Sequence, residues 1–301
     1  MKRRGVDDPL QPKIDTFCKR RPQQSDDTNR GRVTVNNDDM ERKQNDYVDV
    51  KISDFGIHET WMPFFVKEYS ESYFQDILKY LDKRQRNGKE IIPTDIKNIF
   101  NWTRLVNVEN VKVIALGSWP YCKVTNPGSG VAFQCSSKET SSMLHMKKSL
   151  YRHENSRRGF TKDNNFTTTP FNFKKYIRRG SLFLNYYSIT SEIGENNTIH
   201  ASLGWSTFIE NLIKYVISRN CGVIIFILMG EGVSSVEGVL NYIVNEESEK
   251  RERNSLTSLH WRIIKTTDPS RKDFTNENAF GLCDVYLKNF NRMPVFHNQR
   301  T

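Results

Sequence analysis

The chain has 301 residues, and its formal net charge of +10 at pH 7 favours an anionic partner such as nucleic acid. The sequence contains no apolar run of membrane length, no hydrophobic leader and no internal repeat, which argues against membrane, secreted and solenoid proteins. Its five cysteines include no CxxC pair, so neither a disulfide framework nor a zinc site is expected, and no cofactor is implied.

The first 46 residues predict a disordered, charged tail. This segment is rich in Asp, Asn, Gln, Lys and Arg and has Phe17 as its only aromatic residue. Its basic clusters at 2–4 and 19–21 are similar to a bipartite nuclear import signal, so an intracellular, nuclear location is expected. From residue 47 to residue 301 the composition predicts one globular domain.

Alternating strands and helices are predicted along this domain. Apolar residues recur at helical spacing at 74–81, 208–217 and 236–244, which indicates helices that bury one face. Four segments are predicted as strands, at 111–116, Ser181–Asn185, Val223–Met229 and His260–Thr266. The pattern predicts an α/β fold with helices packed around a small parallel sheet, and site loops should gather at the strands' carboxyl ends.

The first predicted strand ends at Gly117 and is followed by a loop that contains Pro120. A buried parallel strand commonly delivers a ligand-binding loop at this point. An ordinary turn between a core strand and a helix has a similar composition, so the loop alone leaves both interpretations open.

A basic stretch at 136–179 carries most of the net charge. It contains 11 Lys and Arg against 3 Asp and Glu, a net of +8, with aromatic residues interleaved. This pattern is typical of a groove that follows a phosphate backbone, although a solvated basic loop is the alternative. The candidate DNA contacts in it are Lys147, Lys148, Arg157, Arg158, Lys174 and Lys175.

Five motifs, in order, make the chain resemble the uracil-DNA glycosylases over roughly residues 57–295. The family's GQDPYH loop is matched by GSWPYC at 117–122, its uracil-reading LLLN strand by SLFLN at 181–185, and its HPSP loop by TDPS at 267–270. The motif HASLGW at 200–205 and the strand GVIIFILMG at 222–230 also match. The resemblance implies a three-layer α/β/α fold, and it implies extrusion of a base followed by cleavage of its glycosidic bond.

Two positions depart from the family pattern where catalysis needs charge. Trp119 stands where the family has the carboxylate that positions water, and Asp268 stands where the family has the histidine that supports the leaving uracil. An indole cannot carry an anion, and a carboxylate would repel the leaving group. We therefore expect impaired uracil excision.

The retained positions belong to binding. The resemblance places Asn185 at the pyrimidine edge, Phe133 on the base face and Tyr121 beside it; the alternative is that all three remain only as core. After the TDPS motif, Ser270, Arg271 and Lys272 suit phosphate contact better than the apolar wedge of the family.

Three functions follow from this pattern. The favoured one is a DNA-binding homologue with impaired excision that serves as an accessory factor in replication or repair, with a DNA polymerase or replication accessory protein as a further partner. The second is an active glycosylase in base-excision repair that uses a relocated carboxylate, Asp268 or Glu231. The third is a protein-interaction module whose pocket is closed.

Overall fold

Four parallel strands form a central sheet whose carboxyl ends lie at one edge. The computed structural model describes residues 50–121, 127–135, 137–155, 171–193, 198–220 and 222–297. The strands are β2 (Val113–Gly117), β3 (Ser181–Asn185), β5 (Val223–Met229) and β6 (His260–Thr266), in the spatial order β3-β2-β5-β6. Because every neighbouring pair is parallel, the loops that follow the strands gather at this edge.

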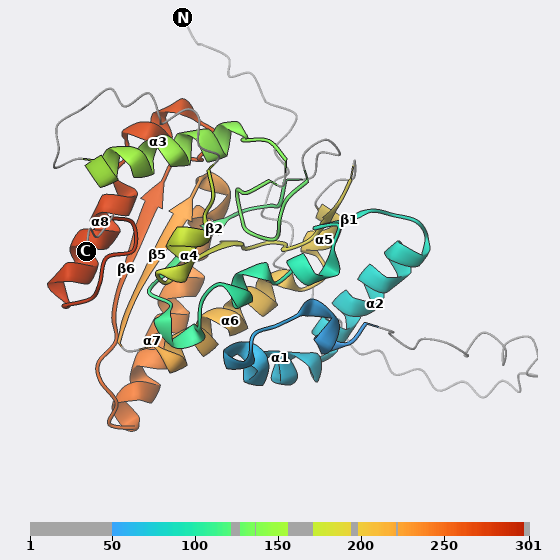
Figure 1. Cartoon of the computed structure of the whole chain (residues 1–301). Coiled ribbons are helices and arrows are strands. Elements are labelled where there is room, and N and C mark those ends of the chain that lie inside the picture. Colours follow the sequence, from blue (N-terminus) through green and yellow to red (C-terminus); the bar gives the residue numbers. More distant parts are fainter. Residues whose placement is uncertain are drawn as a thin grey trace, which may run out of the picture. The chain divides into compact units, whose positions relative to one another are not determined.

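Helices cover both faces of the sheet (Figure 1). On one face lie α6 (Trp205–Arg219) and α7 (Glu237–Arg253), and on the other lie α3 (Ser141–Asn155), α4 (Lys174–Arg178) and α8 (Ala279–Asn289). Next to α6 are α1 (Met62–Tyr69), α2 (Ser72–Arg86) and the short α5 (Thr198–Ala201). The predicted α/β class with three layers is confirmed.

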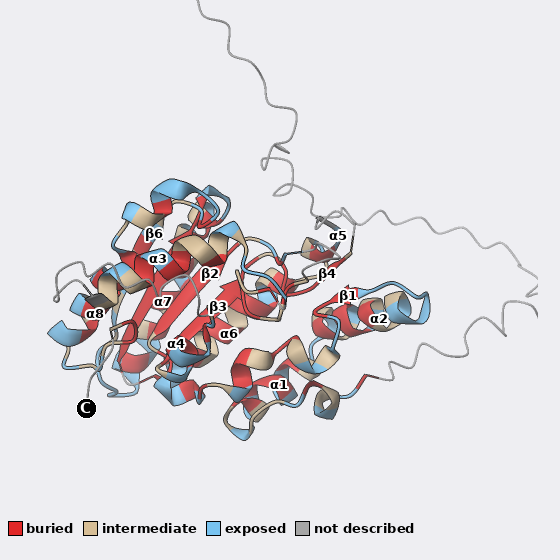
Figure 2. Ribbon diagram, turned by 45° about the horizontal axis from the view of Figure 1, so that its top comes forward, coloured by how far each residue is buried: buried red, intermediate tan, exposed pale blue. Residues whose placement is uncertain are grey.

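The core forms where the predicted apolar stripes meet. Phe74 of α2 stacks on Phe208 of α6 with ring centroids 5.4 Å apart, and both rings are fully buried. Strands β2, β3 and β5 are buried at every residue, whereas the edge strand β6 is buried only at Ile264 (Figure 2). None of the described helices is long and apolar enough to span a bilayer.

The boundaries of three strands were predicted correctly from the sequence, and that of β2 was not. The apolar run predicted a strand over 111–116, but β2 covers Val113–Gly117. The 3-10 helix Val108–Asn110 precedes the strand, and the Val111 N–H caps it by donating to the Val108 carbonyl. Strand β2 therefore begins only at Val113. At the other end Gly117 pairs with Asn185, which extends the strand by one residue.

A small antiparallel ribbon, β1 (Ile91–Ile92) with β4 (Ser191–Glu192), stands beside the main sheet. Buried Glu192 fixes it to the helices. Its carboxylate accepts hydrogen bonds from Arg84 Nε at 2.7 Å and Tyr80 Oη at 3.0 Å, and His200 Nε2 lies 3.2 Å away. The cluster of Glu192, Arg84, Tyr80 and His200, called here the Glu192 network, therefore ties the ribbon to α2 and α5.

Burial and hydrogen bonding act in opposite directions within the Glu192 network. Burial alone would raise the pKa of Glu192, but the bonds from Arg84, Tyr80 and His200 outweigh it and lower the pKa. Burial lowers the pKa of His200, against the opposing influence of the Glu192 carboxylate. Thr190 Oγ1 lies 2.9 Å from His200 Nδ1 and accepts the Trp205 indole N–H at 3.0 Å, so the network continues into α6.

Candidate functional site

The end of β2 delivers the candidate site loop to the carboxyl edge of the sheet. Beyond Gly117 the chain keeps its pairing with the segment after β3, because Tyr186 N–H donates to the Gly117 carbonyl at 2.8 Å and Tyr187 N–H to the Ser118 carbonyl at 3.3 Å. This backbone pairing therefore brings Trp119, which follows Ser118, beside Tyr187.

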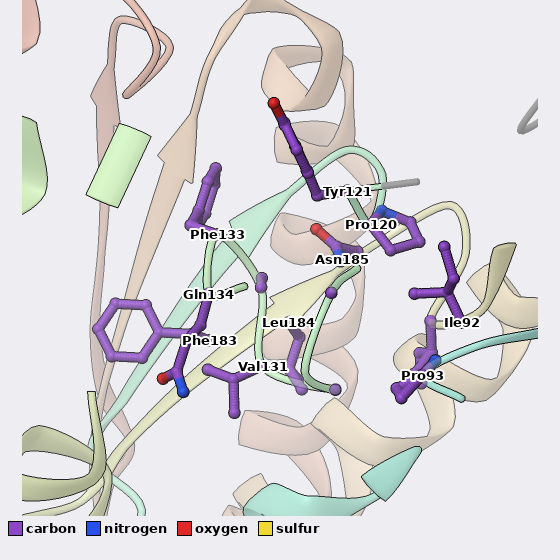
Figure 3. A pocket seen from close by; sticks show the side chains of 14 residues that line it. Ile92, Pro93, Pro120, Tyr121, Val131, Phe133, Gln134, Phe183, Leu184 and Asn185 are labelled. Carbon is purple, nitrogen blue, oxygen red and sulfur yellow. The ribbon is translucent and has the colours of Figure 1, made fainter. Parts of the chain in front are cut away.

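A small pocket lies beside this loop (Figure 3). It brings together the three residues predicted from the sequence to bind a base, Tyr121, Phe133 and Asn185, and Pro120 completes this part of the wall. Ribbon residues Ile92 and Pro93 form another part of it. The cavity holds ≈ 10 Å³, which is room for about one water molecule. In this conformation it is too small for a pyrimidine.

Phe133 closes the inner side of the pocket. A Cβ at Gly117 would lie 2.5 Å from Phe133 Cζ, so the ring packs directly on the end of β2 and only glycine fits there. The Phe133 backbone has φ 65°, a left-handed conformation that a bulky residue adopts at an energetic cost. This strained turn, together with the packing on Gly117, sets the position of the ring.

Asn185 contributes an acceptor without a partner. Its side chain is 7% exposed, and its Oδ1 has no hydrogen-bond partner among the described residues. In Figure 3 the amide lies beside Pro120 and below Tyr121. An unsatisfied buried acceptor costs about 1–3 kcal/mol. The role in base binding that the sequence predicts for Asn185 stays a prediction.

Trp119 points away from the core and is 39% exposed. Its indole stacks on Tyr187, with ring centroids 5.0 Å apart and an interplanar angle of 26°. The Tyr187 hydroxyl donates to the Gly232 carbonyl at 2.8 Å, in the 3-10 helix Glu231–Val236 that follows β5. Tyr187 was missed by the sequence analysis, although its aromatic side chain two residues beyond a predicted strand was a usable signal.

Asp268 lies at the carboxyl end of β6. Its Oδ1 accepts the Ser270 N–H at 2.7 Å, which closes a tight turn, and its Oδ2 would lie 3.1 Å from a Cβ at Gly230. The loop is also held by His145 of α3, whose Nδ1 lies 2.9 Å from the Pro269 carbonyl. Asp268 therefore meets the loop after β5 at the same edge as the pocket.

The predicted DNA contacts fall into different environments. Lys147 is buried and pairs with Glu139 at 3.1 Å, and Lys175 pairs with Glu154 at 2.7 Å. Lys148 and Lys174 have exposed side chains, while Arg157 and Arg158 lie outside the described residues. Lys147 was placed on a DNA surface by charge alone. It lies on the buried stripe of Met143, Met146 and Leu150 in α3, a spacing that the sequence displays.

The loop after Asp268 is exposed. Arg271 pairs with Asp273 at 2.9 Å, and this carboxylate, with smaller contributions from Glu231 and Asp268, raises the pKa of Arg271. Ser270 and Lys272 are also exposed. An open groove of ≈ 590 Å³ lies along Arg271, Lys272, Asp273, Thr275 and Asn276. The phosphate contacts predicted here remain predictions.

Metal and thiol chemistry have no evident site in the described part of the chain. No group of three or more His, Cys, Asp or Glu side chains that could hold a metal ion occurs there. Cys135 lies near the pocket, but burial raises its pKa to about 11, so its thiol stays protonated near neutral pH.

Comparisons with known proteins agree with the fold and with the family resemblance. A uracil-DNA glycosylase of Escherichia coli is 33% identical over 244 residues, 78% of this chain and 93% of the relative. That of Coxiella burnetii is 29% identical over 215 residues, 70% of this chain and 82% of the relative. The mimivirus uracil-DNA glycosylase structure has a TM-score of 0.62 at 19% identity and covers 83% of this chain and 91% of that chain. No family model matches the sequence.

Proposed function

Because this chain belongs to the uracil-DNA glycosylase family, we propose that it binds DNA but is impaired in uracil excision. The proposal rests on Trp119, which the motif resemblance aligns with the family's water-positioning carboxylate and which stacks on Tyr187. An indole offers one N–H donor and no acceptor for a water proton. The removal of one preorganised electrostatic group commonly lowers the rate about 10²- to 10³-fold.

Asp268 adds a second obstacle to excision. It stands where the family has a histidine that supports negative charge on the departing base, and a carboxylate there repels that charge. The Ser270 N–H donates to Asp268 Oδ1 at 2.7 Å and holds this side chain in place at the sheet edge. The two substitutions therefore act in the same direction on the barrier.

The proposed DNA surface combines the carboxyl edge of the sheet with cationic side chains around it. Lys148, Lys174 and Lys272 are exposed and suit phosphate contact, as do Ser270 and Arg271 of the loop after β6. Arg157 and Arg158 remain in the proposal on sequence grounds. Lys147 is left out of this surface because it is buried and pairs with Glu139. Lys175 stays in the proposal, because its side chain is exposed although it pairs with Glu154, as Arg271 does with Asp273.

A single-turnover excision assay on uracil-containing single- and double-stranded DNA tests the proposal. We expect the wild type to bind both substrates without appreciable cleavage. Trp119→Asp should restore a measurable rate, and the double variant Trp119→Asp, Asp268→His should restore more, because each returns a charge that the transition state needs. Robust cleavage by the wild type would overturn the proposed impairment.

An active enzyme with a relocated carboxylate is the second candidate. The observations that favour it are the unpartnered Oδ1 of Asn185 and the proximity of Asp268 to the same sheet edge. If the wild type does cleave, Asp268→Asn and Glu231→Gln in the same assay identify the carboxylate by loss of the rate. A nuclear location and a polymerase or other replication partner stay predictions from the sequence.

A further inference from the structure

Trp119 differs from the other tryptophans of the chain in its exposure. Of the five, Trp61, Trp102 and Trp205 are fully buried and Trp261 is partly buried, whereas Trp119 is 39% exposed. A single exposed apolar side chain is common on protein surfaces, but this exposed indole lies next to the residues that line the pocket, at the carboxyl edge of the sheet. Tyr121, two residues later, is exposed to a similar degree at the same sheet edge.

We propose that Trp119, supported by Tyr187, is a stacking platform for an unpaired nucleobase of single-stranded DNA that remains outside the pocket. This inference rests on the proposed DNA binding and deepens it, because it names the part of the nucleic acid that is recognised. The open face of the indole takes the base, and the opposite face is covered by the Tyr187 ring.

The platform is rigid before any ligand binds. Tyr187 is fixed at its backbone by the bond to Ser118 and at its hydroxyl by the bond to Gly232, so the ring behind the indole cannot turn away. Pro120 follows Trp119 and restricts the backbone there. A prearranged aromatic face loses little conformational entropy on binding, which favours affinity.

The neighbouring pocket favours a stacked base over an inserted one. In this conformation its cavity of ≈ 10 Å³ is too small for a pyrimidine, while the indole beside it is 39% exposed. A nucleobase inside a duplex has both faces covered by its neighbours, so only an unpaired base offers a face to Trp119. Stacking of this kind tolerates any base, because every base has a π face.

A fluorescence titration with two oligonucleotides of equal length tests the platform. One is oligo(dT), and the other carries abasic sites throughout, so it keeps the phosphates and lacks the bases. We expect oligo(dT) to quench the exposed Trp119 fluorescence and to bind more tightly than the abasic strand. Trp119→Ala should weaken oligo(dT) binding about 5- to 150-fold, since one stacked base contributes on that scale.

Matched variants separate stacking from other effects. Trp119→Phe keeps an aromatic face and should retain most of the affinity, measured by anisotropy of a labelled oligo(dT). Tyr242→Ala removes an aromatic side chain on α7 that is 67% exposed, and it should leave the affinity unchanged. The abasic strand should bind wild type and Trp119→Ala equally.

The outcomes distinguish this inference from the function on which it rests. Equal binding of oligo(dT) and the abasic strand, with no effect of Trp119→Ala, would overturn the platform and leave phosphate-mediated DNA binding intact. Failure of the wild type to bind either strand would overturn the proposed DNA binding, and the platform with it. Melting curves of each variant establish that the substitution leaves the fold unchanged.

Discussion

Asn185 combines a cost to stability with a capacity for recognition. Its amide oxygen is buried at the carboxyl end of β3 without a described partner, in a pocket otherwise formed largely by apolar side chains. A residue kept only as core would more easily be apolar, because an unsatisfied buried acceptor weakens the fold. The side chain therefore fits a site that is completed by a ligand donor.

Asn185→Leu should stabilise the free protein by about 1 kcal/mol, because it removes an unsatisfied buried acceptor. Urea unfolding measures the change in the free energy of unfolding. Asn211→Leu is the matched control, since the Asn211 amide donates to buried Glu68 at 3.1 Å. That control should be destabilised. If Asn185→Leu were destabilised to the same extent, the result would mean that Asn185 Oδ1 has a hydrogen-bond partner in the wild type in solution.

The sequence was least informative about the contacts of individual side chains. The motifs placed Tyr121, Phe133 and Asn185 in one pocket, and the structure brings these three together. They did not reveal that Trp119 rests on Tyr187. Such a contact depends on the register between β2 and β3, and no local pattern encodes the pairing of segments so far apart along the chain.

At the scale of elements, the Glu192 network holds together parts of the chain that pack weakly by themselves. The ribbon of β1 and β4 is only two residues long on each side, and a ribbon of that length is not stable alone. Its position depends on Glu192 bonding to α2 and α5. Through Ile92 and Pro93 the ribbon also contributes to the pocket wall.

Glu192→Ala should lower the free energy of unfolding by about 3–5 kcal/mol, because it leaves the partly buried Arg84 guanidinium without its carboxylate. Chemical denaturation measures this loss. The control is Glu249→Ala, which breaks the exposed pair with Arg253 on α7, where the two charges lie 3.9 Å apart. An exposed pair contributes about 0–1 kcal/mol. Equal effects of the two variants would contradict a structural role for the network.

The same network should make the protein less stable in mild acid. The pKa of His200 is lowered in the folded state. As the pH falls through about 6.5, the histidine is therefore protonated in the unfolded chain while it remains neutral in the native protein. The stability that this contributes is fully present above about pH 6.5 and is lost as the pH falls below it. The lowered pKa of Glu192 acts in the same direction at still lower pH.

Melting temperatures between about pH 7.5 and about pH 5 test this dependence. The wild type should melt at progressively lower temperature as the pH falls, and His200→Gln should show a shallower slope. His260→Gln serves as the control, because it replaces an exposed histidine of β6 that lies outside the Glu192 network. A slope that His200→Gln does not alter would assign the acid sensitivity to other groups.

At the scale of the whole molecule, the fold was largely predictable. Strands β3 and β5 match their predicted bounds because a buried apolar run beside a glycine is sharply defined, and β6 also matches although it is buried only at Ile264. Charge was a weaker guide, because a Lys count does not separate a solvated cation from one paired inside the structure, as Lys147 is with Glu139. Net charge indicates an anionic partner, but it does not by itself locate the contact surface.

The long connection between β2 and β3 can accept insertions at little cost to the stability of the fold. The two strands pair directly although residues 118–180, which include the basic stretch, separate them. The entropy of closing a flexible segment grows only with the logarithm of its length, so each doubling of a flexible loop within this connection costs about 0.6 kcal/mol. New cationic residues can therefore accumulate here by insertion while the sheet beneath remains almost as stable as before.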